Sequence, residues 1–155
     1  EKNPKFDIIA FNPKLKEIGF IELKCNKDAC NNDSGLKTHL KDTFACMDLE
    51  FVRHQIAYRF KCLKDNDLIP KNIAGIDSVF LDNNCFSDCK AYCCFLFVKG
   101  TGLQTKKDAI TICQTELKEV LEKKKIMDRL RFSFAEDVNS VDLDNMQPWD
   151  KFKNN

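Results

Sequence analysis

Cysteine is the residue type in this chain with the most chemistry to offer, and its spacing is uneven. Nine cysteines occur in 155 residues, and four of them fall within one ten-residue stretch, at Cys85, Cys89, Cys93 and Cys94. Thiols at this density either form disulfides in an oxidising compartment or bind metal ions. Zinc sites usually show closely spaced cysteine knuckles with histidines or more cysteines behind them. The chain has no C-x2-C pair, and neither of its two histidines is near a cysteine pair. We therefore predict disulfides and a secreted, extracellular protein with no metal and no cofactor.

The apolar residues around these four cysteines are interpreted as a helix over 85–99, with Gly100 and Gly102 as its stop signals. On a helix, side chains four residues apart have Cβ atoms about 5–6 Å apart, whereas a disulfide needs about 3.5–4.5 Å. The four cysteines are therefore expected to bond outward to other segments. The predicted disulfide residues are Cys25, Cys30, Cys46, Cys62, Cys85, Cys89, Cys93, Cys94 and Cys113. An odd number leaves one thiol either free or available to link a second chain as a dimer.

The elements that would position these cysteines are mostly helical in pattern. Apolar residues at intervals of three, four and seven predict a helix over 36–60. Pro70 suits the first position of a short second helix. Thr105 and Asp108 resemble a capping box that opens a long helix reaching about residue 130.

The two ends of the chain are less regular. Segments 6–11 and 18–23 read either as short strands joined by Asn12-Pro13 or as an irregular arm across the core. The tail, 135–155, is predicted to be extended and to pack through Val141, Leu143 and Trp149. The fold class expected is mainly α: a compact, disulfide-stapled bundle of about four to five helices with an irregular or short-stranded N-terminal arm. We expect a single domain over 1–155, made of an arm and loop (1–35), a helical core (36–134) and the tail.

Composition excludes several classes of function. The 25 basic and 24 acidic side chains leave a net charge of +1, which argues against a nucleic-acid partner. The longest uncharged apolar run, 93–98, is too short to span a membrane. The chain begins at Glu1 without a leader, as expected for a mature protein whose signal peptide has been removed, although a fragment would look the same. Asn32 lies in the only glycosylation sequon, so whether it is glycosylated stays open.

The middle of the chain carries a family resemblance. Cys62-Leu-Lys-Asp-Asn-Asp-Leu-Ile-Pro, then Cys89-Lys-Ala-Tyr-Cys93, then Phe-Leu-Phe-Val-Lys-Gly-Thr-Gly-Leu resembles the insect odorant-binding protein family over about residues 50–113. The resemblance implies a helical box around an apolar cavity, a Cys62–Cys93 disulfide, and a second disulfide from Cys89 to Cys113. It also implies a function in carrying a small hydrophobic molecule. The family's last three cysteines, including a closely spaced pair, are represented here by Cys113 alone.

Phenylalanine is unusually abundant, with 13 residues against two tyrosines and one tryptophan. Large apolar side chains at helical spacing either fill a core or line a pocket between helices, and the resemblance favours the pocket. The candidate ligand-binding residues are Phe44, Met47, Phe51, Phe80, Phe95, Phe97, Leu117 and Leu121. No hydrolase, metalloprotease, P-loop or EF-hand motif is present, and His39 and His54 are far from any nucleophile signature. We therefore expect no catalytic residues and no enzyme.

The leading function from sequence is a secreted binding protein. It would carry or sequester a small apolar or amphiphilic ligand, such as a lipid, an odorant or an amine, in an interhelical cavity. The alternative is a secreted effector or toxin-like module with a solid core that acts through its surface on a host or partner protein. The first hypothesis predicts an enclosed volume of roughly 300 Å³ or more, and the second predicts an exposed apolar patch.

Overall fold

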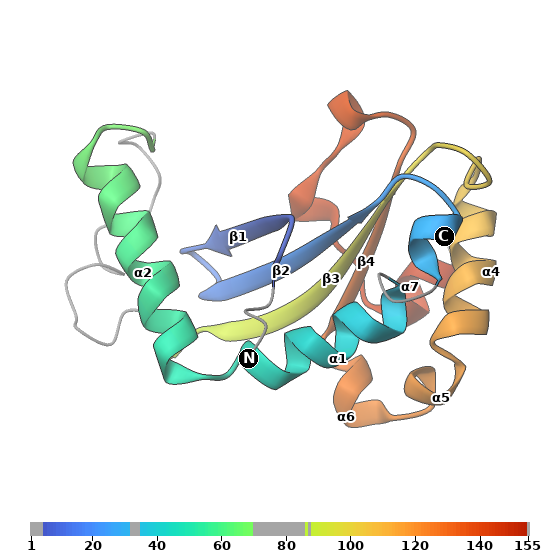
Figure 1. The fold of residues 1–155 in the computed structure, drawn as a ribbon, viewed down its shortest axis with the longest axis horizontal. Coiled ribbons are helices and arrows are strands. Elements are labelled where there is room, and N and C mark those ends of the chain that lie inside the picture. Colours follow the sequence, from blue (N-terminus) through green and yellow to red (C-terminus); the bar gives the residue numbers. More distant parts are fainter. Residues whose placement is uncertain (1–4, 32–34, 70–85, 87, 155) are drawn as a thin grey trace.

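A four-stranded mixed β-sheet forms the centre of the molecule in the computed structural model, which describes residues 5–31, 35–69, 86 and 88–154 (Figure 1). The strands are β1 (Ile8–Asn12), β2 (Glu17–Lys24), β3 (Lys90–Val98) and β4 (Leu130–Ala135). They lie in the order β1-β2-β3-β4; β1 and β2 are antiparallel, and β2, β3 and β4 are mutually parallel. The prediction of a mainly α bundle is therefore wrong: the protein is a mixed α/β fold.

Helices connect the parallel strands. The helical elements are η1 (Asp28–Cys30), α1 (Leu36–Cys46), α2 (Glu50–Asp65), α4 (Lys106–Glu116), α5 (Lys118–Leu121), α6 (Lys124–Met127), η3 (Val138–Ser140), η4 (Leu143–Asn145) and α7 (Trp149–Asn154). Parallel strands cannot be joined by a tight hairpin, so each pair needs a long crossover. One crossover, between β2 and β3, contains α1 and α2, and the other, between β3 and β4, contains α4, α5 and α6.

The segment predicted as the third helix is the central strand β3. Its sequence, Lys-Ala-Tyr-Cys-Cys-Phe-Leu-Phe-Val, is buried at every position after Lys90. A parallel strand that is covered on both faces reads as a continuous apolar run, which periodicity alone cannot distinguish from a buried helix. The strand alternates its side chains, so Cys93 and Cys94 point to opposite faces of the sheet rather than along one side of a helix.

Of the two alternatives for the N-terminal segment, the structure has the pair of short strands. Strands β1 and β2 pair antiparallel from Ile8↔Ile21 to Asn12↔Glu17, and the turn between them contains Pro13. The Asn12 side chain accepts a hydrogen bond from the Leu15 backbone amide at 3.1 Å, a local bond typical of asparagine in turns.

The two long predicted helices are each divided. The first separates into α1 and α2 at residues 47–49, where the Arg53 side chain donates to the Met47 carbonyl at 3.1 Å. The second becomes α4, α5 and α6 before β4 begins. Its start is confirmed, because Thr105 and Asp108 form a reciprocal capping box. The short helix predicted from Pro70 lies outside the described residues.

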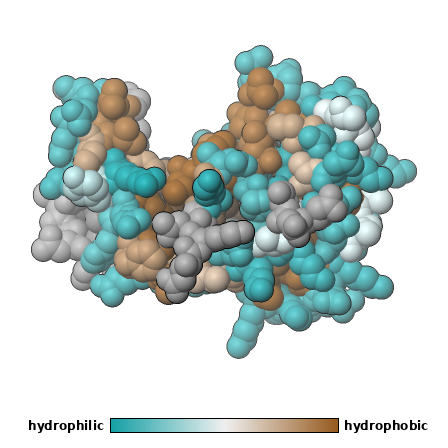
Figure 2. Space-filling model, in the orientation of Figure 1, coloured by the Kyte–Doolittle hydropathy of each residue, from teal (hydrophilic) through white to brown (hydrophobic). Residues whose placement is uncertain are grey.

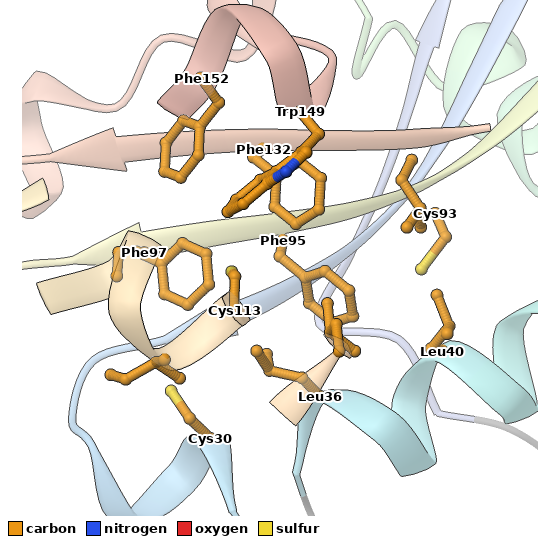
Figure 3. Packing of buried hydrophobic residues seen from close by; sticks show 14 of the residues in the cluster. Cys30, Leu36, Leu40, Cys93, Phe95, Phe97, Cys113, Phe132, Trp149 and Phe152 are labelled. Atoms are coloured by element: carbon orange, nitrogen blue, oxygen red, sulfur yellow. The ribbon is translucent and has the colours of Figure 1, made fainter. Parts of the chain in front are cut away.

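One face of the sheet packs against helices. Phe95 and Phe97 of β3 and Phe132 of β4 are fully buried there, and Figure 3 shows them meeting residues of α1, α4 and α7. Trp149 and Phe152 of α7 lie 5.3 and 5.6 Å from the Phe132 ring. The tail thus packs through Trp149, as predicted, but it does so as a helix rather than as an extended segment.

The opposite face of the sheet has no helix layer among the described residues. Its buried residues form a separate cluster, Ile21, Tyr92, Cys94, Leu96, Val98 and Ala135, against which Val141 and Met146 of the C-terminal segment pack. This face is therefore covered only in part, along the β4 side. Within the described ranges no helix is long and apolar enough to cross a membrane.

The disulfide prediction is not supported by the fold. No disulfide links the described cysteines, and among them only Cys25 is exposed. Six of these cysteines are buried as apolar core residues, a common environment for free cysteine. Cys62 and Cys93, which the family resemblance pairs, are both free, and the sheet is not the helical box that the resemblance implies.

Candidate functional site

A groove lies on the partly covered face of the sheet. This open groove has a volume of about 300 Å³ and lies between the β1–β2 hairpin and the C-terminal segment around η4. Figure 2 shows hydrophobic surface at the bottom of the notch between α2 and this segment. The lining residues are Ala10, Phe11, Asn12, Leu15, Glu17, Gly19, Ile21, Tyr92, Cys94, Arg131, Leu143, Asp144 and Met146. We call this the sheet-face groove.

Strand register explains why the groove is hollow. Ala10, Gly19 and Tyr92 stand side by side on β1, β2 and β3, so one row across the sheet carries a methyl group, no side chain, and a ring. A Cβ placed on Gly19 would meet only the Cys94 Sγ at 3.5 Å and Ile21 atoms at 3.6 Å or more, which are ordinary contacts. Gly19 therefore leaves space that a larger side chain would occupy without straining the backbone.

Arg131 supplies the positive charge of the groove and is held in a fixed position. Its guanidinium lies over the Tyr92 ring, 4.0 Å from the ring centre. Its Nη1 donates to the backbone carbonyls of Leu130 at 2.7 Å and Asp128 at 3.1 Å. Among the described residues no carboxylate forms an ion pair with Arg131, so the charge is oriented but not neutralised by a direct partner.

Acidic groups occupy other positions on the groove wall. The Glu17 carboxylate accepts a hydrogen bond from the Tyr92 hydroxyl at 3.1 Å, which fixes the direction of the tyrosine ring. Asp144 lies on the C-terminal side and is exposed to solvent. The groove therefore has an apolar floor with charged groups at separate places on its wall, the composition expected of a site for an amphiphilic molecule.

Cys94 is the one thiol in the groove lining, and its environment makes it unreactive. Burial raises the pKa of the Cys94 thiol to about 12; the Arg131 charge lowers this pKa and the Glu17 charge raises it, both to a smaller extent. The thiolate, not the thiol, is the nucleophile, and no histidine lines the groove to act as its base. The arrangement is suited to binding rather than to covalent chemistry.

The residues predicted to bind a ligand mostly fill the core. Phe95, Phe97 and Leu117 are fully buried between the sheet and the helices, and Met47 is fully buried near α2. Phe44 and Leu121 pack against these clusters. Phe51 is 58% exposed and lines a smaller surface pocket of about 160 Å³ beside Phe6 and Val52. Phe80 lies outside the described residues, and none of the other seven lines the sheet-face groove.

The two histidines lie away from the groove. His39 of α1 approaches Glu22 of β2, with its Nε2 2.9 Å from a Glu22 carboxylate oxygen that also accepts from Lys24 Nζ at 3.0 Å. Lys24 is only 2% exposed, so its ion pair with Glu22 compensates the buried lysine charge on the face of the sheet that packs against the helices. His54 is largely exposed beside Glu50 on α2. Neither histidine lines the sheet-face groove.

Sequence reasoning missed the groove residues Gly19, Tyr92 and Arg131. The alternation of residues 18–23 does contain the relevant information, because it places Gly19 and Ile21 on the face opposite Phe20. The neighbours of Gly19 come from β3 and β4, which are far away in sequence, so no local pattern would have identified the whole site.

Comparisons with protein-family models, with curated proteins and with solved structures found no match for this chain.

Proposed function

We propose that the protein binds a small amphiphilic ligand in the sheet-face groove, without catalysis. The observation that carries this proposal is the hollow at Gly19, with an apolar floor and a volume of about 300 Å³, the lower end of the range for ligand sites. A volume of this size equals about ten water molecules at about 30 Å³ each. The ligand expected is therefore a short chain or a small ring system.

The arrangement of polar groups supports an amphiphile over a purely apolar ligand. Ile21, Ala10 and Met146 provide apolar contact area in the groove, while Arg131 and Glu17 present charges at its wall. Burying apolar atoms against such a floor supplies affinity at about 25 cal/mol per Å². A few fixed polar groups then orient the ligand.

Uptake of a neutral naphthylamine fluorescent probe tests the proposal. We expect saturable binding by the native protein and a loss of about tenfold or more in Gly19→Leu, equivalent to about 1.4 kcal/mol, because the leucine side chain fills the hollow. Phe51→Ser is the matched control: it alters the smaller pocket near α2 and is expected to leave the affinity unchanged.

Two results would overturn the proposal. One is the absence of saturable probe uptake by the folded native protein. The other is equal affinity in the native protein and Gly19→Leu, which would place the probe elsewhere. Circular dichroism of each variant verifies that a loss of binding does not reflect unfolding.

A further inference from the structure

The charged groups of the groove differ in how completely their hydrogen-bonding capacity is used. Arginine has five N–H donors and no acceptor. Arg131 uses Nη1 for two backbone carbonyls, while Nε and Nη2 have no acceptor among the described residues. Because the guanidinium is already held by the Tyr92 ring and these carbonyls, little side-chain entropy remains to be lost when an anion binds.

The acidic groups of the lining do not cancel this charge. In the sheet, Glu17 of β2 stands beside Lys90 of β3. Arg131 of β4 stands beside Cys94, four residues further along β3 and on the other side of that strand. The Tyr92 ring lies between the two side chains: Arg131 stacks on the ring and Glu17 accepts from its hydroxyl. Glu17 therefore makes no direct ion pair with Arg131. Asp144 is solvent-exposed and makes no ion pair with Arg131.

The shape of the guanidinium determines which anion fits best. Its planar fork matches the two oxygens of a carboxylate and binds them through parallel N–H···O bonds. A carboxylate at Arg131 would leave the rest of the ligand free to extend over Cys94 and Ile21 toward the hollow at Gly19. An ammonium head group would instead have to reach Glu17, which already accepts the Tyr92 hydroxyl.

We infer that the ligand is a carboxylate amphiphile, such as a medium-chain fatty acid or an arylalkyl carboxylic acid, and that Arg131 binds its carboxylate. This inference rests on the proposed function of the sheet-face groove. It adds the chemical class of the ligand and its orientation: carboxylate at β4, apolar part over β2 and β1.

Displacement of the naphthylamine probe by decanoate, decanol and decylamine tests the inference at pH 7, where the acid is ionised. We expect decanoate to compete about tenfold or more better than decanol, and decylamine to compete least. Arg131→Met should abolish the preference for decanoate while the neutral probe still binds. Arg131→Lys should restore part of it, because lysine retains the charge but not the fork.

Lys90→Met is the matched control. Lys90 also lies over the Tyr92 ring, with its Nζ 5.1 Å from the ring centre, but it does not line the groove. Its removal changes the net charge as Arg131→Met does and is expected to preserve the preference for decanoate.

Three results would overturn the inference, and so would a preference for decanoate that survives in Arg131→Met. These are equal competition by decanoate and decanol, stronger competition by decylamine, and a preference that Lys90→Met reduces as much as Arg131→Met. The proposed function fails separately, when the neutral probe itself does not bind. An intact preference in Arg131→Met would move the carboxylate site to another group.

Discussion

Gly100 provides a sharp test of how the strand β3 is joined to the rest of the fold. It lies two residues after the end of β3. A Cβ placed on it would lie 1.8 Å from the Cys25 carbonyl oxygen and 2.9 Å from the Cys25 carbonyl carbon. Ordinary contact begins at 3.4 Å. Gly100→Ala therefore forces the two backbone segments apart by about 1.6 Å, the difference between these distances.

The energetic cost follows from what this displacement disturbs. Overpacking that moves the backbone costs about 1–3 kcal/mol. The Lys27 amide donates to the Thr101 carbonyl at 3.0 Å across the same contact, and losing such a bond adds about 1 kcal/mol. We expect Gly100→Ala to lower the free energy of unfolding by about 2–4 kcal/mol in total, the sum of these two costs.

Gly19→Ala is the matched control, because it adds the same methyl group to an open position. Its Cβ would meet nothing closer than 3.5 Å, and glycine within a strand is less stable than alanine by about 0.5–1 kcal/mol. The two substitutions should therefore change stability in opposite directions.

Urea unfolding followed by fluorescence measures both effects. Trp149 is the only tryptophan and is 6% exposed, so its emission reports the loss of the core. With a slope of about 2 kcal/mol per molar urea, Gly100→Ala should lower the midpoint by about 1–2 M. A midpoint within about 0.25 M of the native value would refute the close contact between Gly100 and Cys25.

Two further predictions concern thiols and pH. Burial raises the pKa of Cys30 and Cys46 to about 11, so brief alkylation of the folded protein at pH 8 should modify exposed Cys25 and spare these two; peptide mass mapping that finds equal modification would contradict the core placement. Hydrogen bonds from Arg129 and Arg53 lower the pKa of half-exposed Asp48. A carboxyl group whose pKa is lower in the folded than in the unfolded protein stabilises the fold at pH values above its unfolded pKa, about 3.9. This stabilisation is lost as the pH falls through the folded pKa. Asp48→Asn should thus lower stability by about 1 kcal/mol at pH 6 and by less at pH 3; a difference that does not change with pH would contradict the ion pair.

Local signals in the sequence predicted the local features of the fold well. The hairpin was one of two alternatives for the N-terminal segment, and its strands and turn are where the alternation and Pro13 placed them. The capping box at Thr105 and the buried Trp149 were also identified. These features depend on neighbouring residues or on one large apolar side chain, so they can be recognised without knowing the rest of the structure.

The sheet could not be predicted in the same way. Residues 90–98 are apolar without a helical or alternating period, and their conformation is decided by β2 and β4, which lie about 70 and 40 residues away in sequence. The prediction of disulfides on a helix added to this error. The dense cysteines were interpreted as cross-links, whereas six of them are buried in the core as small apolar residues. Secretion and the absence of catalysis stay predictions.

The two adjacent cysteines of β3, Cys93 and Cys94, show why residue type alone did not identify the site. Cys93 packs on the helix face and Cys94 lies in the floor of the groove, so adjacent thiols have different roles. Burial keeps both protonated by raising their pKa, which removes the chemistry that made them conspicuous. The binding capacity of the groove comes instead from Gly19, which leaves the space, and from Arg131, which presents a charge without a direct partner among the described residues. Both are common residues in unremarkable local sequence, and only the register of β2, β3 and β4 brings them onto one surface.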